Sequence, residues 1–402
     1  MPTISDAVKS VPRTLAPAEA ERFQAGSVLT FSIAHWVHDT YTAFLAPLLP
    51  ALIENLSLSM TEAGVLTVFM QGPSLLQPVI GHLGDRFNLR YVVILAPAVT
   101  AVMMSLLGIA PNYAVLALFL AMAGLSSAAL HAVGPVMTGN LSGRKLGRGM
   151  GFWMVGGELG RTLGPIIVVS AVAVLTLQGT PWLMIGGLLV SGLLLFWLRD
   201  VQVRPANAHP GLPWRRALRR MGPLLVPLTG IIVVRSFMLS ALTTYLPTFL
   251  TAEGADLWVA GVSLSVLEAA GMGGALLGGV LSDRLGRRVV LLISMLTTPL
   301  LMLVFLAVSG WARFPLLMML GLTALSLGPV IMALVQESFP ENRALANGTY
   351  MSLSFLIRSG AVVVLGVLAD RFGLRLAFTV SAVIPLVGLP LLLLLPRSRN
   401  EK

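Results

Sequence analysis

The sequence predicts an all-α integral membrane protein with twelve transmembrane helices in two pseudosymmetric six-helix bundles. Of its 402 residues, 56% are hydrophobic and 11% are charged, against roughly 25% charged in an ordinary soluble domain. Twelve apolar runs each hold about the twenty residues that a helix needs to cross a bilayer. The chain also matches itself at an offset of about 197 residues, which places Pro50 on Pro247, Gly64 on Gly261 and Arg161 on Arg358.

The twelve predicted spans fall into two sets of six. The first set covers roughly residues 27–52, 62–83, 91–109, 113–137, 149–172 and 182–198. The second set covers roughly 223–250, 258–281, 289–308, 314–337, 346–369 and 376–395. The predicted domains are an N-terminal segment (1–26), an N-terminal bundle (27–198), a linker (199–222), a C-terminal bundle (223–395) and a tail (396–402).

Ionisable residues follow a period of three along these spans. The third, sixth, ninth and twelfth spans contain none, whereas every other span contains at least one. A charge that faces hydrocarbon costs about 2.5–3.5 kcal/mol. The all-apolar spans can therefore face lipid, and the remaining eight are expected to surround something polar.

The basic residues indicate how the chain is oriented. The net charge is +10, and 21 of the 27 Lys and Arg fall in the N-terminal segment, the even-numbered loops and the tail. Three more lie on the outer loops and three lie within spans. This asymmetry predicts that both termini are cytoplasmic in an inner (plasma) membrane protein, and it explains the charge without nucleic acid. The polar first 26 residues predict no cleaved signal peptide.

A duplicated membrane protein that keeps ionisable groups at equivalent depths is typical of a transporter with a central polar site. The sequence has no Walker motif, no nucleophile elbow and no cysteine. We therefore expect no enzyme activity and no cofactor, with transport driven by a gradient. Both halves of a central site are present in one chain, which favours a monomer in the lipid bilayer.

Two cytoplasmic loops carry a repeated motif, Gly81-His-Leu-Gly-Asp85-Arg86 and Gly279-Val-Leu-Ser-Asp283-Arg284. They resemble the signature of the major facilitator superfamily. His35-Trp-Val-His-Asp39, Ser74-Leu-Leu-Gln-Pro78, Leu130-His131 and Gly156-Gly157-Glu-Leu-Gly160 make the first half most similar to the fosmidomycin-resistance type of drug exporter. The resemblance implies the major facilitator fold and drug export. It also makes His131 a candidate substrate-binding residue.

The first predicted span contains candidate proton-coupling residues. His35, His38 and Asp39 share one helical face, where a buried acid beside histidines can load and release a proton. The alternative is an internally satisfied pair that only holds helices together. Glu268 is a second candidate, because the repeat aligns it with the uncharged Gln71.

Three arginines at mid-membrane are candidate substrate ligands. Arg161 and Arg358 occupy equivalent depths, so the pseudo-two-fold axis should bring them to facing walls of one cavity, and Arg235 adds a third cation. A guanidinium group binds carboxylate or phosphonate in a planar fork. The alternative is neutralisation inside the protein, by Glu158 for Arg161 and by other acids for the rest. Gln71 and Glu158 are expected to contribute to the same site.

The two loop motifs are predicted to hold the halves together when the cytoplasmic side is closed. A carboxylate there can cap a neighbouring helix and pair with arginine. The candidate gate residues are Asp85, Arg86, Arg90, Asp283, Arg284 and Arg288. A third partial copy, Gly366-Val-Leu-Ala-Asp370-Arg371, falls on the outer side and is expected only to end a helix. The residues Gly156, Gly160, Gly164 and Pro165 are predicted to allow close helix contact.

These observations favour a proton-coupled exporter of a small amphiphilic or anionic compound, with small-molecule substrate and protons as its partners. A second hypothesis is uptake or exchange of an organic anion, with the arginines as the main determinant. A third is a divalent-metal transporter or sensor that uses His35 and Asp39 with His38 or Glu268. The nearby arginines disfavour a cation as cargo.

Overall fold

A computed structural model describes residues 23–84, 89–198, 214–339 and 343–395, and every regular element among them is a helix. The predicted all-helical membrane fold is confirmed. Most of the predicted N-terminal segment and linker, the tail, and the candidate gate residues Asp85 and Arg86 lie outside the described residues.

The first half contains eight α-helices joined by short 3-10 turns. In chain order they are α2 (Ala25–Thr42), α3 (Leu45–Leu56), α4 (Met60–Gln71), η2 (Gly72–Leu76), α5 (Gln77–Gly84), α6 (Arg90–Ser105), η3 (Leu106–Ile109), α7 (Tyr113–Leu141), η4 (Gly143–Lys145), α8 (Leu146–Leu175), η5 (Leu177–Leu183) and α9 (Met184–Leu198).

The second half repeats this plan. Its elements are α10 (Trp214–Ser240), the π-helical turn η6 (Ala241–Tyr245), α11 (Leu246–Ala252), α12 (Leu257–Leu285), α13 (Arg287–Ala307), η7 (Gly310–Ala312), α14 (Arg313–Ala324), α15 (Leu327–Ser338), α16 (Arg343–Phe372), α17 (Leu374–Val387) and η9 (Leu389–Leu394).

Eleven helical stretches among the described residues are long and apolar enough to cross a membrane. The first predicted span, 27–52, is not among them, because it is broken into α2 and α3 at Ala43 and Phe44. His35, His38 and Asp39 lower the mean hydropathy of this segment, so it does not count among the eleven apolar stretches. The predicted span 223–250 remains one continuous helical stretch but contains the π-helical turn η6 at the equivalent position of the repeat. The basic segment from Trp214 extends this helix beyond the predicted start.

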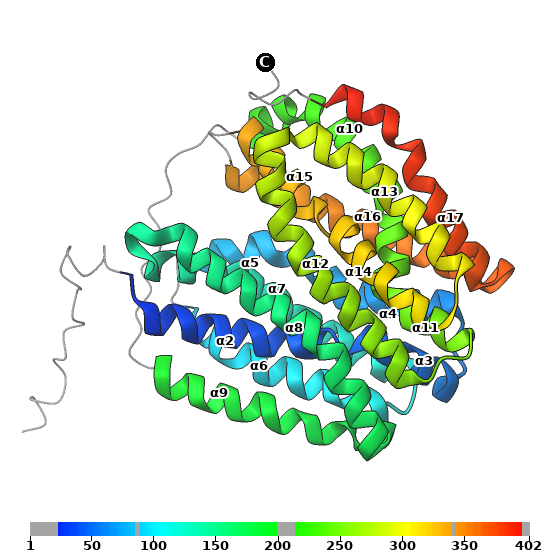
Figure 1. Ribbon diagram of the computed structural model, residues 1–402. Coiled ribbons are helices and arrows are strands. Elements are labelled where there is room, and N and C mark those ends of the chain that lie inside the picture. The colour runs from blue at the N-terminus through cyan, green and yellow to red at the C-terminus, as the bar shows by residue number, and fades with distance from the viewer. Residues whose placement is uncertain (1–22, 85–88, 199–213, 340–342, 396–402) are drawn as a thin grey trace, which may run out of the picture.

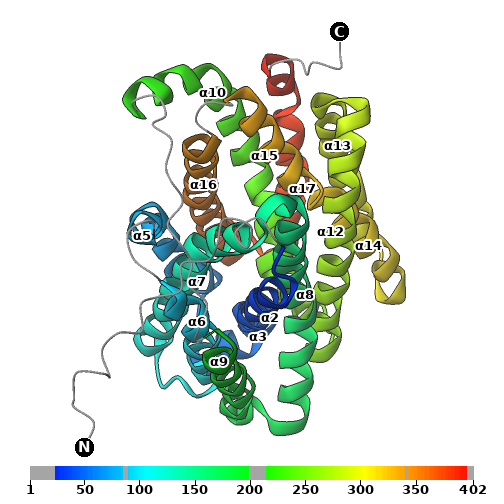
Figure 2. The same ribbon diagram turned by 90° about the vertical axis from the view of Figure 1, so that its left-hand side faces the viewer.

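The two halves meet at one end of the molecule and diverge toward the other (Figure 1). We call the end where α4 begins and α16 ends the junction end. The opposite end, where α2 begins and η9 ends, is the terminal end. Contacts between the halves join α3, α4 and α8 to α11, α12 and α16. In Figure 2 the first half, with α6, α7 and α9, lies toward the lower left, and the second half, with α13, α14 and α15, lies above it and to the right.

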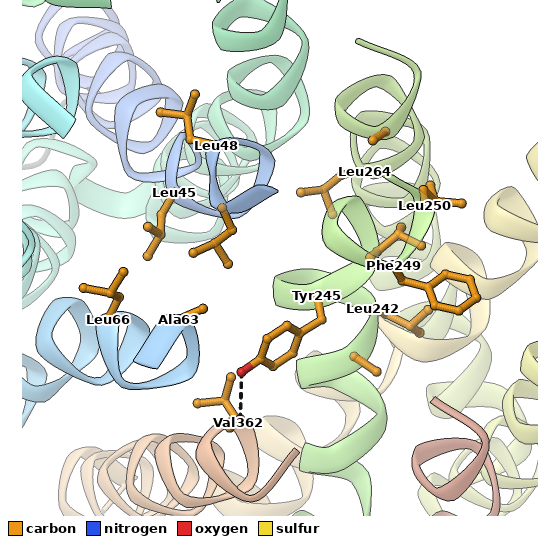
Figure 3. Close-up of a cluster of buried hydrophobic side chains, with 14 of the residues drawn as sticks. Leu45, Leu48, Ala63, Leu66, Leu242, Tyr245, Phe249, Leu250, Leu264 and Val362 are labelled. Carbon is orange, nitrogen blue, oxygen red and sulfur yellow. Dashed lines mark hydrogen bonds between the residues drawn. The ribbon is translucent and has the colours of Figure 1, made fainter. Parts of the chain in front are cut away.

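The apolar cores follow the same division. One core is shared by both halves, whereas two smaller cores each belong to a single half. Figure 3 shows part of the shared core, in which Leu45, Leu48, Ala63 and Leu66 of the first half face Leu242, Tyr245, Leu264 and Val362 of the second. The structure is therefore closed at the junction end.

Ion pairs of Glu253 with Arg313 and Arg375 connect three helices at the junction end of the second half, and we call these three residues the charged staple. One carboxylate oxygen of Glu253 lies 2.5 Å from Arg313, and the other lies 2.6 Å from Arg375. Burial alone would raise the pKa of Glu253, but the hydrogen bonds from both arginines outweigh it and hold that pKa below its ordinary value. The staple ties α11 to α14 and α17.

We predict that Glu253→Gln lowers the stability of the purified protein by no more than about 1 kcal/mol, because solvent reaches the pair and screens it. Because the pKa of the Glu253 carboxyl is lower in the folded than in the unfolded protein, its ionised form stabilises the fold. This stabilisation is present above the unfolded-state pKa and is lost as the pH falls through the folded-state pKa. The difference in Tm between wild type and variant should therefore be full at neutral pH and shrink below about pH 4. Glu54→Gln, at an exposed glutamate of the other half, is the control and should leave the Tm at neutral pH unchanged.

Candidate functional site

The middle of the first half holds a cluster of two histidines and one aspartate. Helix α2 carries His35 and Asp39 one turn apart, and α7 carries His131. The Nε2 atoms of the two histidines are 3.2 Å apart. The carboxylate oxygens of Asp39 lie 3.3 Å from Nε2 of His35 and 3.7 Å from Nε2 of His131. His35 and Asp39 are buried, and Oδ1 of Asp39 has no hydrogen-bond partner among the described residues.

Backbone carbonyls fix the orientation of both imidazole rings. Nδ1 of His35 lies 2.9 Å from the carbonyl oxygen of Trp153, and Nδ1 of His131 lies 2.9 Å from that of Ser127. A carbonyl only accepts, so each Nδ1 donates its hydrogen and a neutral ring keeps its lone pair on Nε2. Two such lone pairs and the Asp39 carboxylate then converge with no hydrogen between them. One cation between these three acceptor atoms, either a proton or a metal ion, would therefore stabilise the cluster.

His38, the third predicted member of this cluster, hydrogen-bonds to α6 instead of to Asp39. Its Nδ1 lies 3.0 Å from the hydroxyl of Thr100, which donates to Ser126. Within the described residues, Nε2 of His38 is buried without a hydrogen-bond partner. The structure thus brings His131, and not His38, into contact with the aspartate.

Helix α8 approaches α2 closely because glycines line its contact face. The predicted packing residues Gly156, Gly160 and Gly164 all lie there. A Cβ atom on Gly160 would lie 2.7 Å from Cβ of Asp39, and one on Gly157 would lie 3.1 Å from the Asp39 carboxylate. A larger side chain would push the helices apart. These glycines therefore set the distance between α8 and the cluster.

A cavity of about 190 Å³ lies between the two halves. The predicted site residues Gln71, Arg161, Arg358 and Glu268 line it, together with the predicted packing residue Pro165. The rest of the lining is Thr42, Ala43, Leu45, Ala46, Thr67, Met70, Thr243, Thr244 and Leu264. Arg161 and Arg358, which the repeat aligns, contribute to the same cavity from opposite halves.

The charged groups of this cavity are unevenly paired. Arg161 is ion-paired with Glu158 on its own helix, and its Nε lies 3.9 Å from the carboxylate of Glu268 on α12. Arg358 donates to the hydroxyl of Thr243 at 2.7 Å. Arg358 forms no ion pair with a carboxylate among the described residues. The cavity therefore offers one guanidinium group, that of Arg358, whose partner is a neutral hydroxyl.

Three candidate substrate residues lie outside this cavity lining. Glu158 pairs with Arg161, and His131 belongs to the histidine–aspartate cluster. Arg235 is buried in the second half, where it donates to the carbonyl of Ala324 at 3.1 Å. Sequence reasoning missed Thr243 and Trp153, whose ring stacks on His35 with centroids 4.0 Å apart. A threonine in an apolar span gives no signal, because its hydroxyl can bond to its own helix.

The candidate gate residues of the second half bond within that half. Asp283 lies 2.6 Å from Arg287, which also pairs with Glu337 at 2.7 Å. Arg288 donates to the carbonyl of Leu393 at 3.2 Å, while Arg284 is exposed. In the first half, Arg90 donates to the hydroxyl of Tyr91. Each of these bonds lies within one half, which agrees with a structure that is closed at the junction end.

We predict that Gly160→Ala disrupts the α2–α8 contact. The new methyl group would meet the Trp36 carbonyl at 2.6 Å and the Thr40 backbone nitrogen at 2.7 Å, and neither backbone group can rotate away. Thermal unfolding of the purified variant should show a loss of about 1–3 kcal/mol, typical of overpacking. Gly151→Ala on the same helix has open space around its Cβ and is the control. Equal Tm values for the two variants would contradict this account of the contact.

Comparisons with known proteins agree with this architecture. The chain matches the family model of the Major Facilitator Superfamily over residues 31–312 and 273–402. It is 24% identical to the fosmidomycin resistance protein of Escherichia coli (strain K12), over 98% of this chain and 100% of the relative. It is 25% identical to the uncharacterised MFS-type transporter YfnC of Bacillus subtilis (strain 168), over 93% of each chain.

Solved structures with the same fold include a bacterial homolog of the human lysosomal transporter Spinster in an inward-facing and occupied conformation. Its TM-score is 0.76 at 14% identity, covering 92% of this chain and 96% of that one. A D-xylose–proton symporter gives 0.73 at 16% identity, covering 94% and 99%. The resemblance inferred from sequence is confirmed, and this protein belongs to the major facilitator superfamily, whose members are multi-pass membrane transporters and not enzymes.

Proposed function

We propose that this protein is a proton-coupled exporter of a small anionic or amphiphilic compound that works by alternating access. The observation that carries the proposal is the cluster of His35, His131 and Asp39, in which three acceptor atoms converge without a donor. One proton on either Nε2 would satisfy all three groups. Loss of that proton leaves a buried carboxylate, which is costly and must change the balance of conformations.

The proximity of the cluster to the cavity supports coupling between proton and substrate. Both sites are built on α2 and α8, since Asp39 contacts Gly160 and the next residue, Arg161, lines the cavity. The charge of Asp39 also acts on Arg161 electrostatically. A change of protonation at the cluster therefore reaches the cavity through a single helix contact.

The likeness to a fosmidomycin resistance protein supports export as the direction of transport. A transporter confers resistance to a compound when it moves that compound out of the cell. The basic residues at the terminal end support a cytoplasmic location for that end and, with the bacterial relatives, an inner-membrane protein. In that orientation the structure is open toward the cytoplasm, which suits capture of an intracellular substrate.

A second candidate function is uptake or exchange of an organic anion. The observation that favours it is Arg358, whose guanidinium group is bonded to a hydroxyl and to no carboxylate among the described residues. A bound anion would take that place with charge-assisted hydrogen bonds. In anion uptake the proton moves in the same direction as the anion, and in uncoupled exchange it does not move. In the proposed exporter the proton moves in the direction opposite to the substrate.

A transition-metal ion is the other possible occupant of the histidine–aspartate cluster, since the three ligand atoms lie within 4.8 Å of one another. We favour the proton because the arginines at the neighbouring cavity repel a metal cation. Thermal stabilisation by Zn²⁺ that disappears in His35→Ala would assign the cluster to a metal ion instead.

We predict that the wild-type protein moves protons out of acid-loaded proteoliposomes when substrate is supplied on the opposite side. Protons would be followed with a pH-sensitive dye, using fosmidomycin, simple organic anions and lipophilic cations as the panel. Asp39→Asn should lose this proton movement, because the neutral amide no longer stabilises a proton on Nε2 of His35 or His131. The same variant should still exchange labelled substrate for unlabelled substrate.

Each possible result of this experiment selects one function. Full proton movement in Asp39→Asn would remove Asp39 as the coupling site. Proton movement in the same direction as the substrate would select anion uptake. Exchange of labelled anion without any proton movement in the wild type would select uncoupled anion exchange.

We predict that Arg358→Gln weakens binding of anionic substrates by about 10- to 100-fold, the loss expected for one charge-assisted hydrogen bond. The measurement is the KM of transport together with direct binding to detergent-solubilised protein. Arg219→Gln removes an exposed arginine far from the cavity lining and is the control. An unchanged KM in Arg358→Gln would place the substrate elsewhere in the cavity.

A further inference from the structure

Asp370, at the last turn of α16, bonds across the junction between the two halves. Its Oδ1 accepts the backbone N–H of Met60 at 2.7 Å, and its Oδ2 accepts that of Thr61 at 2.9 Å. Oδ2 also accepts the hydroxyl of Thr61 at 2.5 Å. Met60 and Thr61 are the first two residues of α4. A side chain of the second half thus caps a helix of the first half.

Helix α4 needs this partner, because its own capping residues leave two donors free. Ser59 and Glu62 form a capping box that satisfies the backbone N–H groups of Glu62 and Ser59. The N–H groups of Met60 and Thr61 have no acceptor on their own helix. A carboxylate placed there also interacts favourably with the positive end of the helix dipole.

Tyr245 makes a second connection at the same place. Its hydroxyl lies 2.8 Å from the carbonyl oxygen of Met60 and 3.2 Å from that of Val362 (Figure 3). Room for it exists because Gly64 and Gly366 lack side chains: a Cβ on either would lie 2.5 Å or 2.8 Å from the tyrosine hydroxyl. Polar bonds from Asp370 and Tyr245 therefore join α4 to α16 directly beside the shared apolar core.

The sequence around Asp370 is the third copy of the loop motif. Gly366-Val-Leu-Ala-Asp370-Arg371 repeats Gly279-Val-Leu-Ser-Asp283-Arg284, but it lies at the junction end and not at the terminal end. In this structure Asp283 pairs within its own half, whereas Asp370 bonds to the other half. Sequence reasoning had assigned Asp370 only to the end of a helix, so its partner in the other half is new.

We propose that Asp370 is a latch that stabilises the conformation closed at the junction end, and that opening this end during transport requires its release from Met60 and Thr61. The bonds are exposed to solvent, so water can replace them, and the latch can open within a working cycle. The proposal depends neither on proton coupling nor on the identity of the substrate.

The test measures the two conformations directly by the distance between spin labels. The chain contains no cysteine, so Asn55→Cys with Ala252→Cys labels the junction end of the full-length protein without background. Lys145→Cys with Leu285→Cys labels the terminal end. Asp370→Asn should raise the ratio of junction-open to junction-closed molecules by about tenfold, with matching closure at the terminal end.

Thr61→Val removes one of the three bonds and should shift the ratio in the same direction by less. It also keeps the test valid if Asp370→Asn proves poorly folded. Arg371→Gln removes an exposed charge next to the latch and none of its bonds, so it should leave both distance distributions unchanged. Wild-type distributions in folded Asp370→Asn and Thr61→Val would overturn the proposal.

Discussion

The arrangement of this site depends on the close contact between α2 and α8. Gly156, Gly160 and Gly164 let the two helix backbones approach until a single methyl group would collide with the opposite chain. Ionisable groups can remain at this depth only if protein, not lipid, surrounds them. Because Gly160 faces Asp39 and Arg161 follows it, the contact that buries the cluster also positions an arginine at the cavity. The two sites therefore cannot move independently of each other.

The sequence predicts the fold well because its determinants are simple. Apolar length gives the spans, and the 197-residue offset gives the two halves. The same reasoning indicated that Arg161 and Arg358 share a cavity, since buried cations at equivalent depths of a pseudosymmetric pair must face inward. The break at Ala43 and the π-helical turn η6 were not predicted, because no glycine marks either position. A proline follows each, at Pro47 and Pro247, but proline also lies inside unbroken helices such as α6.

Contacts between distant helices were harder to predict than the helices themselves. Helical spacing places His35, His38 and Asp39 on one face of α2, but it cannot say which side chain of another helix meets them. His131, on α7, reaches Asp39, whereas His38 is occupied by Thr100. The partner of Asp370 was missed for the same reason, since Met60 and Thr61 bond through backbone groups that every residue possesses.

Closure at the junction end combines a large nonspecific interaction with a few specific ones. The shared core draws leucine, alanine and valine side chains from both halves, and separating them would expose apolar surface at about 25 cal/mol per Å². An apolar core of this kind favours the closed conformation, but it does not determine when the junction end opens. The polar bonds at its edge, from Asp370 and Tyr245, add a smaller free energy that one substitution can remove. In an alternating-access cycle the two ends must be nearly equal in stability, so small edge interactions can decide which end is open.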